Sequence, residues 1–432
     1  MPENPHHNSG SRSDHPVPVA MDDDAARRVL LSASADAAMD DLWGQQPNKI
    51  PDPFVWPHAD ALASSERELD APVVDVGAAM RDAGDGEGMR RAAELVAAAC
   101  ASHGMFQVTG HGLDPALARA ALDGAAGFFR LPLATKQRAR RSPGNLTGFA
   151  AAHIDRFTSN LPWKETLSFA HRDHHHRHVV VDYFTSVLGT DFKPLGYGGV
   201  PGILRRDEEG GTGDNGGDRV LGVGRSWYRD FFSDGCSIMR CNYYPACPEP
   251  ERTLGTGPHC DPSALTLLLQ DGDVDGLQVL AAGEWRPVRP RPGALVVNIG
   301  DTFMALSNGR YRSCLHRAVV HRERERRSLA FFLCPREDRV VRPPTRLLAA
   351  AGQHHEDDDE EDKQQQQQQQ PRRYPDFTWA ELAHFTQRHY RADARTVEAF
   401  ACWLGAGAPT CAAATSAAAC DESQADEAQG TF

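Results

Sequence analysis

The spacing of apolar residues divides this chain of 432 residues into a partly helical first half and a strand-rich second half. Within Met89 to Ser102 and Pro115 to Phe129, apolar residues recur every three or four positions, as on a helix with one buried face. Gly104 and Pro132 follow these stretches and are typical helix-ending residues. With a buried strand expected at APVVDV and another at MFQVTGHG, the first half is predicted to be an α/β unit.

From Met239 onward the pattern changes to short strands separated by glycine and proline, namely IMRCNYYP, ALTLLLQD, GLQVL, WRPVRP, ALVVNIGD, CLHRAVV and SLAFFLCP. Many short strands with turn residues between them predict an antiparallel sandwich or barrel, of which the jelly roll is one form. A last helix is expected from Thr378 to Tyr390, where Thr378 and Glu381 form a capping box. The predicted fold class is α+β: a double-stranded β-helix (jelly roll) core with an α/β N-terminal portion and flanking helices.

Segments of biased composition mark the expected boundaries along the chain. Nine glycines and a charge run at 196–218 predict a mobile loop, and an acidic block with seven consecutive glutamines predicts an unstructured insertion. The expected division is 1–48 (disordered), 49–195 (N-terminal α/β portion), 196–218 (mobile loop), 219–345 (jelly-roll domain), 346–373 (insertion), 374–404 (C-terminal helix) and 405–432 (disordered tail).

Composition excludes several classes of protein. A formal net charge of -13 argues against a nucleic-acid partner, because phosphate binding requires a basic surface. The sequence holds no apolar run long enough to cross a bilayer, so no membrane partner is expected. Ten cysteines without a CxxC pair are typical of reduced thiols inside cells. We therefore expect a monomeric protein of the cytoplasm, with the nucleus as an alternative.

The stretch PHCDPSALTLLLQD places two metal-binding side chains two residues apart, because His259 and Asp261 would share one face of a strand. His316 in a later strand offers a third ligand. Two histidines and one carboxylate form a facial triad that suits non-haem Fe(II) oxygenases. Two alternatives stay open at this point: the pair could be a polar strand end, or the metal could be Zn(II).

A candidate anchor for a second ligand lies in the strand after His316. Arg326 and Ser328 share a face there, and a guanidinium beside a hydroxyl suits the distal carboxylate of a dicarboxylate. Tyr244 could add another hydroxyl. The alternative is that Arg326 belongs to the solvated run HRERERR. A zinc site would leave Arg326 and Ser328 without a purpose.

With these motifs in place, the sequence resembles the plant 2-oxoglutarate/Fe(II)-dependent dioxygenases, and within them the gibberellin 20-oxidases. The wider resemblance rests on HGMFQVTGHG, NYYPAC, the H-x-D pair, the distal histidine and R-x-S, between about residues 70 and 403. The narrower one rests on longer strings: IPDPFVWP, LPWKETLSF, TLGTGPHCDPSALTLLLQD, NIGDTFMALSNGRYRSCLHRAV and YPDFTWAELAHFTQRHYRAD.

This resemblance implies a reaction and its cofactors. The three candidate ligands would hold Fe(II), while Arg326, Ser328 and Tyr244 would bind 2-oxoglutarate. O2 would be the other co-substrate, and ascorbate a further cofactor. The substrate would be a C20 gibberellin, an apolar carbocycle with carboxylate, whose carbon 20 is oxidised stepwise and lost to give a C19 gibberellin. Decarboxylation of 2-oxoglutarate to succinate and CO2 would accompany each step.

Four residues are weaker candidates for the substrate pocket. Lys164 in LPWKETLSF could bind the substrate carboxylate, although it could equally form a solvated pair with Glu165. Trp163 is expected to pack at the pocket or at a domain seam. Asn308 and Tyr311 precede His316 and are expected at the pocket mouth.

One departure from the family keeps other functions open. Residues 196–218 stand where the family normally has a long amphipathic helix against the jelly roll, and they lack apolar periodicity. The alternatives are a 2-oxoglutarate dioxygenase for another gibberellin position or a flavonoid, and a catalytically impaired homologue that only binds a ligand.

Overall fold

The protein is described by a computed structural model that covers residues 49–56, 64–81, 86–142, 146–154, 160–171, 225–272, 274–349, 371–389 and 396–405. The expected N-terminal segment 1–48, the loop 196–218, most of the insertion 346–373 and the tail beyond residue 405 lie outside the described residues. In the described part, no helix is long and apolar enough to cross a membrane.

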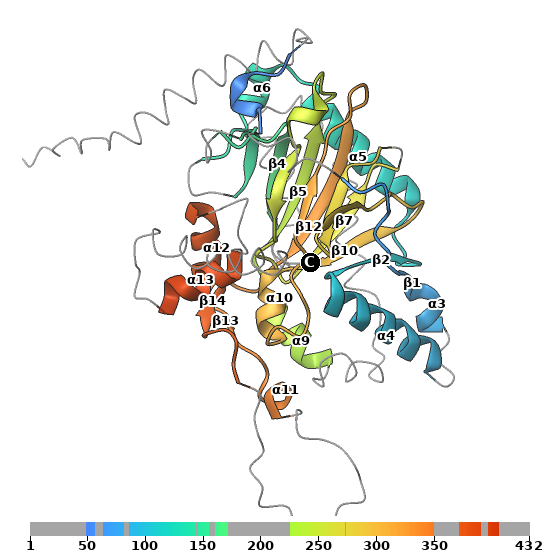
Figure 1. The fold of residues 1–432 in the computed structure, drawn as a ribbon, viewed down its shortest axis with the longest axis vertical. Coiled ribbons are helices and arrows are strands. Elements are labelled where there is room, and N and C mark those ends of the chain that lie inside the picture. Colours follow the sequence, from blue (N-terminus) through green and yellow to red (C-terminus); the bar gives the residue numbers. More distant parts are fainter. Residues whose placement is uncertain are drawn as a thin grey trace, which may run out of the picture.

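Two sheets form the centre of the fold (Figure 1). Only β1 and β2 pair in parallel in the larger sheet; all its other pairs are antiparallel. Its order is β1 (Val73–Asp75), β2 (Met105–Thr109), β10 (Leu295–Ile299), β7 (Leu265–Gln270), β12 (Arg326–Leu333), β5 (Ser237–Tyr244), β4 (Glu165–His171) and β3 (Gly148–Ala151). The smaller sheet has the order β6 (Thr256–His259), β11 (His316–Ala318), β8 (Leu277–Ala281) and β9 (Glu284–Pro287). This arrangement confirms the predicted α+β fold with a jelly-roll core.

The helices that the apolar spacing predicts are present, with ends shifted by two residues or fewer. They are α4 (Glu87–Ser102), α5 (Pro115–Phe129) and α12 (Trp379–His389). Asp114 caps α5 by accepting the amide of Ala116 at 2.8 Å. The Glu381 carboxylate accepts the Thr378 amide at 2.7 Å, which completes the predicted capping box before α12.

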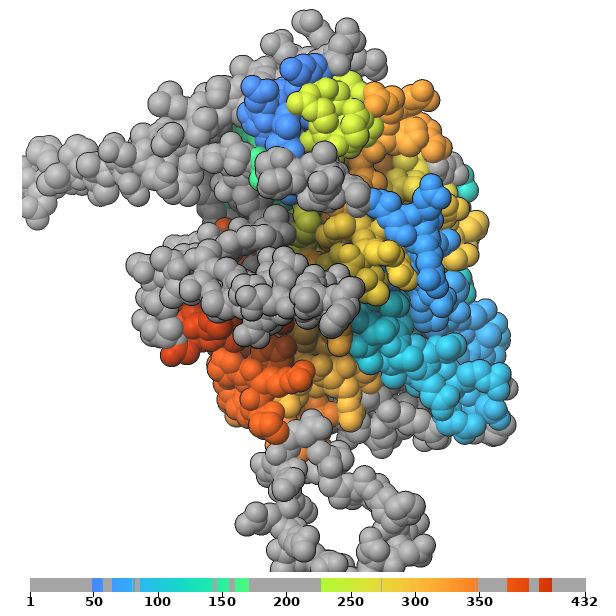
Figure 2. Space-filling view, in the orientation of Figure 1, coloured from blue at the N-terminus to red at the C-terminus, as the bar shows by residue number. Residues whose placement is uncertain are grey.

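The shorter helices connect the sheets or pack at the ends of the molecule (Figure 1). They are η1 (Asp52–Phe54), α3 (Val76–Arg81), α6 (Leu133–Gln137), α9 (Arg225–Phe232), η3 (Pro250–Arg252), α10 (Asp301–Leu306), α11 (Thr345–Ala349) and α13 (Thr396–Gly405). A two-stranded sheet of β13 (Val340–Val341) and β14 (Phe377–Thr378) joins the C-terminal elements to the core, and these elements form the red and orange end of the surface in Figure 2.

The two faces of the larger sheet differ in chemistry. On the outer face, Leu167, Cys241 and Leu329 belong to a core cluster with Phe128 and Phe129 of α5. On the inner face, the alternate positions of β4, β5 and β12 include the polar or basic residues Thr166, Ser168, Arg240, Asn242, Tyr244, Arg326 and Ser328. A strand pattern that is apolar outside and polar inside directs the polar side chains toward the interior of the jelly roll.

A buried ion pair links α6 to β4. Lys136 and Glu165 are 3% and 1% exposed, and Lys136 Nζ lies 2.7 and 2.8 Å from the two carboxylate oxygens. Burial raises the pKa of the Glu165 carboxyl, and Lys136 offsets only part of that rise. Glu165 therefore pairs with Lys136, so the alternative of a solvated pair with its neighbour Lys164 is wrong.

Some strands differ from the expected pattern. APVVDV is only half buried, because β1 is an edge strand and Val73 is 43% exposed. Strands β3, β4 and β6 were not predicted. The sequences of β3 and β6 (GFAA and TGPH) lack an alternation of apolar and polar residues, whereas TLSF in β4 has one that was overlooked.

Candidate metal centre and ligand cavities

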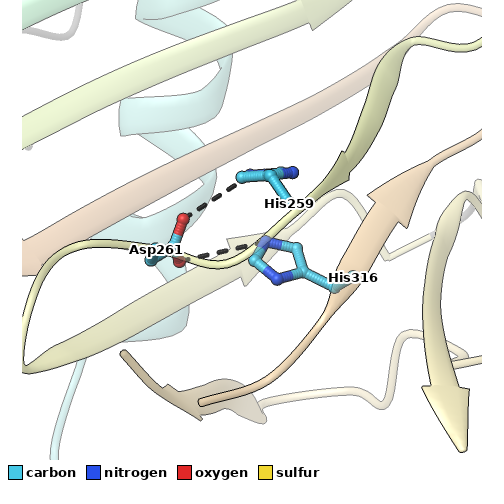
Figure 3. Close-up of side chains that lie close together, drawn as sticks. All are labelled: His259, Asp261 and His316. Carbon is cyan, nitrogen blue, oxygen red and sulfur yellow. Dashed lines mark ion pairs between the residues drawn. The ribbon is translucent and has the colours of Figure 1, made fainter. Parts of the chain in front are cut away.

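The three candidate metal ligands meet where the smaller sheet ends. His259 is the last residue of β6 and pairs in register with His316, the first residue of β11. One ligand atom from each of His259, Asp261 and His316 lies within 4.8 Å of the others. Asp261 Oδ1 is 3.5 Å from His259 Nε2, and Asp261 Oδ2 is 3.8 Å from His316 Nε2 (Figure 3).

Asp261 is not positioned by a strand, contrary to what the sequence indicated. Strand β6 ends at His259, so Asp261 lies in the turn before β7 and not on the face of a strand. Its Oδ2 accepts hydrogen bonds from Thr266 Oγ1 at 2.6 Å and from Asn298 Nδ2 at 2.8 Å. Its backbone oxygen accepts the amide of Asp301 at 2.8 Å. Hydrogen bonds, rather than strand alternation, therefore orient the carboxylate.

Each histidine is oriented through its other ring nitrogen. His259 Nδ1 lies 2.9 Å from the carbonyl oxygen of Gly257, and His316 Nδ1 lies 2.9 Å from that of Cys314. A protonated Nδ1 that donates to a carbonyl leaves Nε2 as the lone-pair donor. Both Nε2 atoms point toward Asp261, so the tautomers suit metal binding.

The electrostatics of the site favour a divalent cation. Burial, together with the neighbouring His316, lowers the pKa of His259 to about 3. Burial alone would raise the pKa of the Asp261 carboxyl, but the two histidines and the hydrogen bonds from Thr266 and Asn298 bring it below its ordinary value. One carboxylate and two neutral imidazoles fit Fe(II), which non-haem oxygenases hold with this ligand set.

A second set of candidate residues lines the inner face of β5 and β12. Arg326 pairs in register with Tyr244, and the guanidinium carbon lies 5.1 Å from the centre of the tyrosine ring. Arg326 and Ser328 are 2% and 1% exposed, so the alternative that places Arg326 in a solvated run is wrong. Arg326 Nη2 donates to Gln270 Oε1 at 2.9 Å, while its buried Nε has no hydrogen-bond partner.

A cavity of about 60 Å³ connects this arginine to the metal ligands. Its wall contains Arg326, Ser328, Tyr244 and all three candidate ligands. Gly276 makes room for the arginine, because a Cβ there would lie 2.6 Å from Arg326 Cδ. A buried guanidinium that lines the same small cavity as the metal ligands fits a ligand that chelates the metal at one end and carries a carboxylate at the other.

A larger cavity of about 280 Å³ is also lined by His259 and Asp261. Apolar side chains make much of its wall: Trp56, Pro162, Ile238, Phe332, Trp379 and Ala383. Lys164 and Arg240 also line it, and both border the smaller cavity as well. An apolar cavity with a few basic groups suits an apolar substrate that carries acid groups.

The predicted substrate residues separate into two groups. Lys164 is 4% exposed, donates to Thr256 Oγ1 at 2.9 Å and lines both cavities. Trp163 is 1% exposed and packs edge-on against Phe54 with ring centres 5.2 Å apart, so it is a packing residue beside the site.

Asn308 and Tyr311 do not lie at the mouth: among the described residues, neither lines either cavity. Asn308 turns the chain after α10 with a φ of 51°, donates to the Pro371 carbonyl and accepts the Arg373 amide. Tyr311 is buried against Phe303 in a core cluster. The helix α10 thus directs this loop away from the cavities.

Several residues of the site were not identified from the sequence. Asn298 had a usable signal, since it is a polar residue in the apolar strand ALVVNIGD. One face of α12 also lines the larger cavity, at the helical spacing of Trp379, Ala383, Thr386 and Gln387. Arg240 and Trp56 had no such signal, because their place in the wall depends on contacts between distant parts of the chain.

Comparison with known proteins identifies the family. Residues 235–335 match the 2OG-Fe(II) oxygenase superfamily, and residues 71–183 match the N-terminal region of non-haem dioxygenases in morphine synthesis. The chain is 59% identical to gibberellin 20 oxidase 2 of Oryza sativa subsp. indica, over 93% of this chain and 97% of that protein. It is 46% identical to gibberellin 20 oxidase 5 of Arabidopsis thaliana, over 84% and 89% of the two chains.

Solved structures show the same fold. The crystal structure of JOX2 in complex with 2OG, Fe and JA has a TM-score of 0.61 and 26% identity, and the match covers 85% of this chain and 97% of that one. The rice dioxygenase for auxin oxidation has a TM-score of 0.54 and 29% identity, with 73% and 95% covered. The predicted enzyme class and the cofactors Fe(II) and 2-oxoglutarate are thereby confirmed. The chain belongs to the 2OG-Fe(II) oxygenase superfamily and, within it, to the gibberellin 20-oxidase family.

Proposed function

We propose that this protein oxidises carbon 20 of C20 gibberellins stepwise to give C19 gibberellins, with decarboxylation of 2-oxoglutarate to succinate and CO2. The observation that carries this proposal is the 59% identity to a gibberellin 20 oxidase along nearly the whole of both chains. The cavities support it, because an apolar chamber with basic groups borders the His259–Asp261–His316 cluster.

In the proposed mechanism, the residues of the chain bind and orient the reactants. His259, Asp261 and His316 hold Fe(II), which supplies the oxidising chemistry with O2 and 2-oxoglutarate when these are bound. Arg326 and Ser328 bind the distal carboxylate of 2-oxoglutarate in the smaller cavity, with Tyr244 against the guanidinium.

The larger cavity receives the gibberellin. Its apolar walls exclude water from the carbocycle, and Lys164 and Arg240 provide positive charge at the side nearest the metal. Because His259 and Asp261 line both cavities, a ligand in either cavity lies beside the metal ligands. This geometry keeps the carbon to be oxidised close to the metal without displacing 2-oxoglutarate.

The test is turnover with defined components. The protein is purified anaerobically with Fe(II) and given 2-oxoglutarate, ascorbate, O2 and a C20 gibberellin, and the products are analysed by mass spectrometry. We expect C20-oxidised products and succinate, and neither when 2-oxoglutarate is omitted. A folded, iron-loaded protein that yields no C20-oxidised product would contradict the proposal.

The same assay distinguishes the alternatives. A flavonoid dioxygenase, or one for another gibberellin position, would give products oxidised elsewhere, and a homologue that only binds its ligand would release no substrate-dependent succinate.

We also propose that the protein acts as a monomer in the cytoplasm, without nucleic acid. Sedimentation should then give a single species near 47.2 kDa, and fractionation should find the protein in the cytoplasmic fraction, with the nucleus as a further location, and outside membranes.

A further inference from the structure

Arg240 occupies a central place on the inner face of the larger sheet. It lies on β5, between Ser168 of β4 and Ala330 of β12 in the strand register. Next along the same face, Asn242 pairs with Ser328, and then Tyr244 with Arg326. The inner face therefore carries one arginine at each end of a short row of polar residues.

The side chain of Arg240 is held by its neighbours. Its Nε donates to Ser168 Oγ at 3.0 Å, and its guanidinium carbon lies 5.2 Å from the centre of the Phe332 ring. Ala330, opposite it in the register, has only a methyl group and leaves space beside the guanidinium. A guanidinium oriented through Nε and an aromatic face can direct its two terminal nitrogens toward a carboxylate.

The two arginines differ in the cavities that they line. Arg326 lines only the smaller cavity, whereas Arg240, like His259 and Asp261, lines both the smaller and the larger cavity. In the register, Arg240 lies opposite Ala330, which is four positions after Arg326 on β12. Four positions correspond to about 13 Å along a strand at roughly 3.3 Å per residue. That separation allows one acid group on each side of the metal centre.

The charges of the walls favour an anionic group at Arg240. The described residues that line the two cavities include four strongly basic side chains and a single carboxylate, that of Asp261. Arg317 and Arg326 line only the smaller cavity, and Lys164 and Arg240 line both. Asp261 is already bound to Thr266 and Asn298 and belongs to the metal cluster. Lys164 donates to Thr256. Arg240 is the basic group that combines a forked, oriented donor with a position in the larger cavity.

We propose that Arg240 is the principal anchor for a carboxylate of the substrate, and that it thereby sets which carbon faces the metal. This inference rests on the proposed function, since it names the residue that orients the gibberellin in the larger cavity. It assigns to Arg240 the role first considered for Lys164, which instead supports the wall through Thr256.

The test compares a C20 gibberellin with its methyl esters in wild type and Arg240→Leu. Wild type should prefer the free acid over the ester at the relevant carboxylate by about tenfold to a hundredfold in kcat/KM, the range for a charge-assisted hydrogen bond. Arg240→Leu should lose this preference, because KM should rise much more for the acid than for the ester. The KM for 2-oxoglutarate should stay within about twofold, because Arg326 is retained.

Control variants keep the outcome interpretable. Arg327→Leu removes the same charge from the other face of β12 and should preserve the acid preference. Ser168→Ala removes the acceptor of Arg240 Nε and should weaken the preference only in part, with little loss of volume. This second variant decides the matter if Arg240→Leu does not fold.

The possible results separate the two proposals. An acid preference that survives both Arg240→Leu and Ser168→Ala overturns this inference, and one that disappears in Lys164→Met instead assigns the anchor to Lys164. A wild-type protein that oxidises no gibberellin overturns the proposed function and this inference together. Loss of the preference in Arg240→Leu, with normal turnover of the ester, supports both.

Discussion

Each candidate metal ligand is held on its far side by a polar partner, which fixes its direction before any metal binds. The histidines lie against the Gly257 and Cys314 carbonyls, and Asp261 accepts from Thr266 and Asn298. Partners of this kind set the tautomer of a histidine and the orientation of a carboxylate. The residues around the ligands therefore contribute to metal affinity as well as the ligands themselves.

The first prediction concerns the ligand from β11. His316→Ala should abolish both stoichiometric iron binding and product formation, because two ligands remain where three are needed. Iron content after anaerobic loading and succinate release are the measurements. His111→Ala is the control, since that histidine contacts the Gly293 carbonyl away from the cavities. Full iron occupancy in His316→Ala would contradict the assignment.

The second prediction tests the hydrogen bond that orients Asp261. Thr266→Val keeps the side-chain shape but removes the donor to Asp261 Oδ2, and should weaken iron affinity about tenfold to a hundredfold. Titration with Fe(II) under anaerobic conditions measures this. Thr166→Val, a buried substitution in β4, should leave iron affinity unchanged. Equal iron affinities in Thr266→Val and Thr166→Val would show that the hydrogen bond from Thr266 to Asp261 does not contribute to iron binding.

The third prediction concerns the co-substrate. Arg326→Ala should raise the KM for 2-oxoglutarate by about tenfold or more, because a buried charge-assisted contact to its carboxylate is lost. The neighbouring Arg327→Ala, on the other face of β12, serves as the control. An unchanged 2-oxoglutarate requirement in Arg326→Ala would mean that another residue binds the co-substrate.

At the residue scale, the sequence identified the side chains that metal binding and co-substrate binding require. It missed the side chains that reach the site only because distant parts of the chain pack together. His259, Asp261, His316, Arg326 and Ser328 line one cavity as predicted, although Asp261 lies in a turn and not on a strand face. Arg240 is one basic residue among 46 in the chain, and only the register of β4, β5 and β12 distinguishes it. Asn308 and Tyr311 were misplaced because nearness to His316 in sequence is not nearness in space.

At the element scale, the turn that carries Asp261 is pressed against the end of β10. A Cβ on Gly300 would lie 2.0 Å from the Ser263 carbonyl oxygen and 2.8 Å from that of Asp261. Both contacts are with backbone, so a side chain could be accommodated only by moving the turn. The glycine of NIGD is therefore required for the close approach of two chain segments.

The fourth prediction follows from this contact. Gly300→Ala should lower the free energy of unfolding by about 1–3 kcal/mol and weaken iron binding, because the turn with Asp261 must shift. Urea unfolding and Fe(II) titration measure the two effects. Gly127→Ala in α5 is the matched control: its Cβ meets nothing within 4 Å, so it should be neutral or stabilising. Unchanged iron affinity in Gly300→Ala would contradict the argument.

The fifth prediction concerns the pair that joins α6 to β4. Lys136→Met should destabilise the protein by about 3–5 kcal/mol, because it leaves the Glu165 carboxylate buried without its partner. Lys136→Met combined with Glu165→Leu should recover most of that loss, since no buried charge remains. Urea unfolding of the single and double variants is the measurement. A double variant as unstable as the single one would mean that packing, not charge, dominates at this site.

Among the elements, helices were more predictable than strands for a physical reason. The apolar period of α4, α5 and α12 arises within each segment, and their caps are local. Strands such as β4 and β6 depend on partners far along the chain. TGPH in β6 has no strand pattern of its own, and its place is set by pairing with β11.

At the scale of the whole molecule, the site is built from widely separated parts of the sequence. The metal cluster and the smaller cavity come from the two sheets of the jelly roll. The larger cavity also needs Trp56 from before β1 and the inner face of α12 from after β14. The core sheets thus supply the metal ligands and part of the larger cavity wall, and Trp56 and α12 complete that wall.

The position of α12 has a consequence for how the protein is made. A ribosome releases the chain from its N-terminus, so all the residues assigned to iron and 2-oxoglutarate leave it before Trp379, Ala383, Thr386 and Gln387. When the residues assigned to iron and 2-oxoglutarate have been synthesised, the residues that α12 contributes to the wall of the larger cavity are still missing. Of the described residues that line the two cavities, those of α12 are therefore the last to be synthesised, long after Arg240, the proposed anchor of the substrate.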